Sequence, residues 1–189
     1  EGNDYDAGEE DYYYSYSYLE DFYVKDGRLI AISQESFGSE NSSSSAAVVQ
    51  VFDITDVEDV QLLDEYRQSG YVNTSRMIGD TLYLVTNHYI YNGNKDFYIP
   101  YCGVGEAQNT LDAECIYKTS SPSSTDYLVI GAINTANGVQ NTDTKAIFGA
   151  PSTVYFNENN MYITNAEGMY TLYKGYNSEY EGKIQIIKA

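Results

Sequence analysis

Side chains able to do acid–base or metal chemistry are unevenly distributed in this sequence. His88 is the only histidine among 189 residues, so no site can be built from several histidines of this chain. A Ser-His-Asp arrangement would need His88, and no Gly-x-Ser-x-Gly segment accompanies it. We therefore expect His88 at the surface or packed against a loop, and no catalytic residue in this segment.

Acidic residues cluster in the turn that follows residues 48–54. Asp53, Asp56 and Asp59 offer the oxygen ligands that Ca²⁺ prefers, although the regular spacing of a calcium loop is missing. Aspartates in turns commonly bond their own backbone instead. We expect no cofactor, with calcium at this turn as the alternative.

Tyrosine is the most unusual component, with 22 Tyr and no Trp. A tyrosine ring combines an apolar face with a polar tip, which suits sugar or protein surfaces. Two clusters are candidate binding sites, with packing inside the fold as the alternative. The first cluster contains Tyr12–Tyr14, Tyr16 and Tyr18, and the second contains Tyr89, Tyr91, Phe97, Tyr98 and Tyr101.

Arg76 is one of only 10 basic residues and lies beside Met77 and Ile78. We expect it to be at least half-buried and paired with an acidic side chain or a carbonyl. Anion binding near the axis of the fold is the alternative.

Cys102 and Cys115 are the only cysteines and have twelve residues between them. The pair predicts a loop-closing disulfide, worth roughly 3 kcal/mol in the chain-entropy model. Metal binding is the weaker interpretation, because neither a nearby His nor a Cys-x-x-Cys supplies further ligands.

The charge balance excludes some partners. With 28 acidic and 10 basic residues the net charge is −18, which repels nucleic acid and anionic membrane surfaces. No apolar run approaches the roughly 18 residues of a membrane span, so this segment predicts no membrane insertion. Such acidity is typical of a soluble extracellular protein, and we expect a secreted or cell-surface location.

A repeat along the chain predicts the elements that position these residues. Three segments share the order strand, tight polar turn, strand: Phe22–Ser33, Ser75–Thr86 and Thr153–Thr164. Asp26-Gly27 and Gly79-Asp80 are two-residue hairpin signals. Further strand-like runs complete four-stranded units at a period of about 50 residues, which is typical of β-propeller blades. Neighbouring blades would cover the apolar run at residues 82–85 on both sides.

The predicted fold is therefore all-β, with about three propeller-like blades of four antiparallel strands. Residues 1–20 form an acidic, Tyr-rich leader and residues 21–189 a partial propeller. Blade units span about 22–70, 71–149 and 150–189, with an insertion at 88–125 and a flexible loop at Ser36–Ser45. Because propellers generally need four blades, we expect a piece of a larger propeller, whose open blade edges could form a homodimer.

Three motifs then point to a family. They are Val51–Asp56 (VFDITD), Ser75–Asp80 (SRMIGD) and Thr153–Tyr162 (TVYFNENNMY). The chain resembles the middle of the C-terminal β-propeller domain of secreted bacterial and archaeal proteins, over roughly Phe22–Ile187. That family is defined by fold and secretion, so the resemblance implies an architecture and a location but no reaction.

The sequence favours a non-catalytic binding scaffold whose insertion, Tyr89–Cys115, recognises a protein or a carbohydrate. The alternative is part of a secreted hydrolase. Its active site would lie on the propeller axis, would use carboxylates such as Asp80 or Glu167, and would need blades that this chain lacks.

Overall fold

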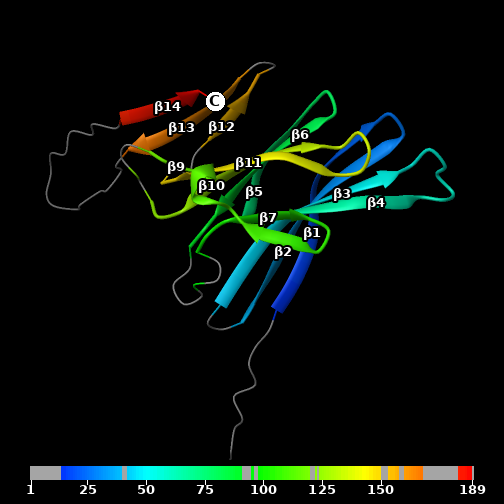
Figure 1. Ribbon diagram of the computed structural model, residues 1–189, viewed down its shortest axis with the longest axis horizontal. Helices are drawn as coiled ribbons and strands as arrows, with labels where there is room; N and C mark the ends of the chain where they lie inside the picture. The colour runs from blue at the N-terminus through cyan, green and yellow to red at the C-terminus, as the bar shows by residue number, and fades with distance from the viewer. Residues whose placement is uncertain are drawn as a thin grey trace, which may run out of the picture.

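The computed structural model describes residues 14–39, 42–90, 95, 98–119, 122, 124–149, 153–157, 160–167 and 183–188. Three sheets follow one another along the chain and lie side by side, from the first at the right of Figure 1 to the third at the upper left. The one helical element whose bounds lie within the described residues is a short 3-10 turn, Ala113–Cys115. The prediction of an all-β fold is confirmed.

The first sheet begins with a meander of four antiparallel strands. They are β1 (Tyr14–Lys25), β2 (Arg28–Ser39), β3 (Ser42–Asp53) and β4 (Gln61–Ser69). Asp26 and Gly27 join β1 to β2 with φ angles of 49° and 72°. Positive φ at both positions defines a type I′ hairpin turn, as the Asp-Gly pair predicts.

The second sheet repeats this arrangement. Its first four strands in spatial order are β5 (Tyr71–Ile78), β6 (Thr81–His88), β10 (Tyr127–Asn134) and β11 (Gln140–Phe148). All three pairings between these strands are antiparallel. The third sheet contains β12 (Val154–Phe156), β13 (Met161–Glu167) and β14 (Lys183–Lys188).

The insertion at 88–125 contributes strands to two sheets. Its hairpin, β7 (Tyr101–Val104) and β8 (Ala107–Thr110), pairs antiparallel with β4 of the first sheet. Its last strand, β9 (Ile116–Lys118), pairs parallel with β11 of the second sheet. The insertion therefore covers the outermost strand of each meander, which reduces unpaired edge length.

Two clusters of buried apolar side chains pack between neighbouring sheets. Ile30, Val49 and Leu84 belong to the cluster between the first and second sheets. Val85 and Ile163 belong to the cluster between the second and third. Because Leu84 and Val85 are adjacent, strand β6 is buried on both faces, and the prediction for residues 82–85 is confirmed.

The predicted loop at Ser36–Ser45 is wrong for most of its residues. Strand β2 runs to Ser39 and β3 begins at Ser42, with eleven residues of each strand paired before the turn-side pair Ser39–Ser42. The first three strands therefore reach past the end of the other strands, at the bottom of Figure 1. Backbone pairing along a third strand, β1, offsets the low apolar content of this Ser-rich segment.

None of the described helical residues forms a helix long and apolar enough to cross a bilayer.

Candidate binding surface

A row of tyrosines lies on the extended part of β1. The rings of Tyr14 and Tyr16 have centroids 6.1 Å apart, and those of Tyr16 and Tyr18 are 6.2 Å apart. Their planes differ by 17° and 14°, so the three rings are nearly parallel. Tyr16 and Tyr18 are 49% and 48% exposed. Alternation along the strand places all three on one face, because only every second residue is a tyrosine.

A second pair continues this row from the next sheet. Tyr71, the first residue of β5, contacts Tyr89 with ring centroids 6.0 Å apart. Local desolvation and the Glu20 carboxylate raise the pKa of the Tyr18 hydroxyl, and Tyr71 is close enough to act in the same direction. We call Tyr14, Tyr16, Tyr18, Tyr71 and Tyr89 the tyrosine platform.

Small residues lie beside the platform on β2. Tyr14 pairs with Gly38 and Tyr16 with Ser36, so both small residues are on the tyrosine face. The Ser36 hydroxyl is buried and has no hydrogen-bond partner among the described residues. A buried hydroxyl without a partner is unusual, since such groups normally bond protein or water. This hydroxyl is closed to solvent, so the exposed part of the platform consists of its rings.

The insertion contributes less to this surface than the sequence predicts. Tyr89 is exposed and belongs to the platform. Tyr101 is half-buried on β7, where burial raises the pKa of its hydroxyl and Ser44 bonds to it. Tyr98 is also half-buried, while Tyr91 and Phe97 lie outside the described residues.

Arg76 differs from the expectation in its burial. It is exposed on β5, and within the described part of the chain no hydrogen bond or ion pair involves its side chain. It acts electrostatically on the Tyr23 hydroxyl, which hydrogen-bonds Ser75 at 2.8 Å. The apolar neighbour Met77 does not indicate burial of Arg76, because adjacent strand residues point to opposite faces.

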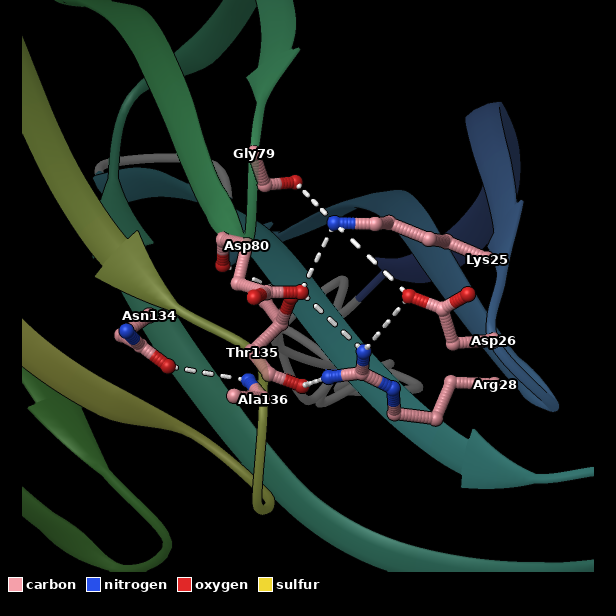
Figure 2. A network of polar contacts seen from close by, with 8 residues as sticks. All are labelled: Lys25, Asp26, Arg28, Gly79, Asp80, Asn134, Thr135 and Ala136. Carbon is pink, nitrogen blue, oxygen red and sulfur yellow. Dashed lines mark hydrogen bonds and ion pairs between the residues drawn. The ribbon is translucent and has the colours of Figure 1, made fainter.

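Asp80 belongs to a cluster of turns that joins the first two sheets (Figure 2). Lys25 donates to its Oδ1 at 2.9 Å, and Arg28 Nη2 donates to the same atom at 3.1 Å. Arg28 Nη1 also donates to the carbonyl of Thr135, and Lys25 donates to the Gly79 carbonyl at 2.8 Å. The Thr135 amide donates to the Asp80 carbonyl at 2.9 Å. These contacts tie the β1–β2, β5–β6 and β10–β11 turns together.

This arrangement does not favour Asp80 as a hydrolytic acid. The hydrogen bonds from Lys25 and Arg28, in that order, lower the pKa of its carboxyl. A general acid needs a raised pKa, so the geometry favours a structural role for Asp80. We call its ion pairs with Lys25 and Arg28, which link adjacent blades, the Lys25–Arg28–Asp80 joint. Glu167 ends β13, and its side chain lies outside the described part of the structure.

Two buried glutamines connect the first and second sheets. Gln34 accepts a bond from the Val72 amide at 2.8 Å and donates to the Gly70 carbonyl at 3.3 Å. Gln68 donates to Thr86 at 3.0 Å and accepts from the Tyr66 hydroxyl at 3.0 Å. Tyr66 is fully buried, and that burial raises its pKa. Gln34 therefore fixes β2 relative to β5, and Gln68 fixes β4 relative to β6.

The three calcium candidates accept bonds within their own turn. Asp53 Oδ1 accepts from the Thr55 hydroxyl at 2.7 Å and from the Thr55 amide at 2.9 Å, which lowers its pKa. Asp56 accepts from the Glu58 amide at 3.0 Å, and Asp59 from Gln61 at 2.6 Å. In the described residues no three metal-ligating side chains cluster.

The predicted disulfide is not formed in the structure. Cys102 is buried on β7, where it interacts with Tyr66, and Cys115 is half-buried at the end of the 3-10 turn. His88, expected at the surface or against a loop, is buried at the end of β6 with its ring 6.0 Å from that of Tyr127.

Sequence reasoning missed Tyr71 and the Lys25–Arg28–Asp80 joint. The available signal was positional, because Asp26-Gly27 and Gly79-Asp80 are equivalent turns of successive repeats. Equivalent turns meet at one end of adjacent blades, so charged residues beside them are brought together.

Comparison with known proteins agrees with this architecture. A family model described as a beta propeller domain matches residues 6–188. No curated protein and no solved structure matches the chain significantly. Since the family model covers almost the whole chain, and the sheets have the blade arrangement, this chain belongs to the β-propeller domain family.

Proposed function

We propose that this β-propeller chain is a non-catalytic binding module of a secreted or cell-surface protein, and that its ligand contacts the tyrosine platform. The single observation supporting this most strongly is a row of three nearly parallel rings on a protruding β-ribbon, of which Tyr16 and Tyr18 are exposed. Exposed aromatic clusters are costly to leave in water and are enriched at recognition sites.

The chemistry of the platform favours a polypeptide ligand with basic residues. Glu20 and Asp21 lie one residue beyond the tyrosine row, after Leu19, and the chain has a net charge of −18. Cations stack on tyrosine faces and are attracted by neighbouring carboxylates. A neutral carbohydrate would use the ring faces but gain nothing from the charge.

Site-specific photo-crosslinking tests the proposal. A photoreactive phenylalanine derivative would replace Tyr16 in one variant and Tyr155 in a control. Tyr155 is 63% exposed but lies on the third sheet, away from the platform. After incubation with the surface fraction of the source cells, we expect a discrete crosslinked protein from position 16 alone.

Equal crosslinking from both positions, or none from position 16, would contradict the proposal. A crosslinked species that resists proteases and is removed by glycosidases would instead identify a carbohydrate ligand.

A further inference from the structure

We propose that two copies of this chain associate through the exposed edge of β1 at residues Tyr14–Tyr18, as a weak, reversible antiparallel dimer. This inference concerns the edge of the β-ribbon, whereas the proposed ligand contacts its face. It therefore does not depend on the proposed function.

The first support is that no described strand covers this edge. Strand β1 is terminal in its sheet and pairs, among the described strands, with β2 alone. Residues 15–22 are all exposed. An edge strand of this length presents a row of backbone donors and acceptors to another strand.

The hairpin geometry shows which backbone groups face outward. The type I′ turn at Asp26-Gly27 makes Lys25 and Arg28 a hydrogen-bonded pair, and alternate residues of β2 then face β1. Along the extended part these are the partners of Tyr14, Tyr16 and Tyr18. The N–H and C=O groups of Ser15 and Ser17 consequently point to the open edge.

The features that normally prevent an edge strand from pairing with another chain are missing from this segment. Tyr14–Leu19 contains no charged residue and no proline. Within strand β1, the register irregularity and the first carboxylates occur only at Leu19–Asp21. Bulges, charges and prolines are the features that normally prevent edge-to-edge pairing.

The order of residues favours a second copy over another strand. Tyr-Ser-Tyr-Ser-Tyr reads the same in both directions. In an antiparallel pair centred on Tyr16, every tyrosine faces a tyrosine, and Ser15 faces Ser17 of the other copy. The outward backbone groups of Ser15 and Ser17 are then in hydrogen-bonding register. Cross-strand aromatic pairs are among the favourable ones, and the two-fold axis makes the contact self-complementary.

Size and charge limit the strength of this association. Five residues from each copy are far fewer than the roughly 20–30 of a standard interface, so the dimer is weak. The net charge of −18 on each copy repels the other. Because salt screens that repulsion, the dimer fraction increases with ionic strength, whereas binding of a basic partner decreases.

Sedimentation equilibrium over a range of protein concentrations, at low and at high salt, tests the inference. We expect a monomer–dimer equilibrium whose dimer fraction increases with both variables. Ser15→Pro/Ser17→Pro removes two outward donors and should abolish dimerisation. Ser15→Thr/Ser17→Thr keeps the donors and should retain it.

Tyr16→Lys provides an independent variant, in case the prolines disturb the strand. It places like charges opposite each other at the two-fold axis, yet lowers the net negative charge of each copy, so loss of the dimer cannot be due to overall repulsion. A monomer at every concentration and salt would overturn the inference, as would a dimer that survives both the Pro and the Lys variants.

Discussion

At the scale of single residues, the clearest feature is how few charged side chains link the turns of the first two blades. One carboxylate oxygen of Asp80 accepts bonds from both Lys25 and Arg28. The Arg28 side chain is only 12% exposed, and a guanidinium that is so little hydrated needs acceptors. Asp80 and the Thr135 carbonyl provide them.

Asp80→Asn should make the stability of the protein less dependent on pH in the acid range. The wild-type carboxyl has a lowered pKa in the folded state. Its contribution is therefore fully present above the ordinary carboxyl pKa of about 4 and is lost as the pH falls through the folded value. The difference in unfolding free energy between wild type and variant, from urea titrations, should be positive at pH 7 and shrink below about pH 4.

Asp143→Asn is the matched control, since Asp143 forms a more exposed ion pair with Lys145. A pH-independent difference for Asp80→Asn, or an equal effect of the two variants, would show that the joint is not electrostatic.

At the scale of elements, the buried amide network explains why the second sheet has glycine at position 131. A Cβ added there would lie 2.3 Å from Gln68 Oε1 and 3.0 Å from the Tyr66 hydroxyl. Strand β10 thus approaches β4 closely enough for polar contacts only because this residue has no side chain.

Gly131→Ala should destabilise the protein by about 2–4 kcal/mol, because it both overpacks the site and disrupts the Gln68–Tyr66 bond. Gly79→Ala is the comparison: φ is +60° there and the added Cβ would meet nothing within 4 Å. Its cost should be the backbone strain alone, about 1–2 kcal/mol. Urea unfolding of the two variants would measure both, and equal losses would contradict the role of the network.

The elements also show what the sequence could predict. The turns at Asp26-Gly27 and Gly79-Asp80 and the doubly buried strand β6 depend on local residue types, so the pattern located them correctly. The pairing of Ser36–Ser39 with Ser42–Ser45 depends on a partner strand rather than on apolar residues, and was predicted as a loop. The tyrosine row was recognised as a candidate site, but its continuation through Tyr71 required the contact between two blades.

At the scale of the whole molecule, the insertion is part of the architecture. Strand β7 pairs with β4 of one blade, and β9 with β11 of the next. Removing residues 90–124 would expose two strand edges and is a poor test of recognition, because aggregation would follow. Single substitutions on the exposed rings avoid this difficulty.

The proposed binding face is tested most directly by the binding of fluorescently labelled protein to cells of the source organism. Tyr16→Ser/Tyr18→Ser removes two exposed rings from the face and keeps the small polar residue type that already alternates with them along β1. We expect the apparent affinity to fall about tenfold or more, whereas Tyr155→Ser on the third sheet should leave it unchanged. Undiminished binding of the double variant, with its fold intact by circular dichroism, would contradict the assignment of the tyrosine platform.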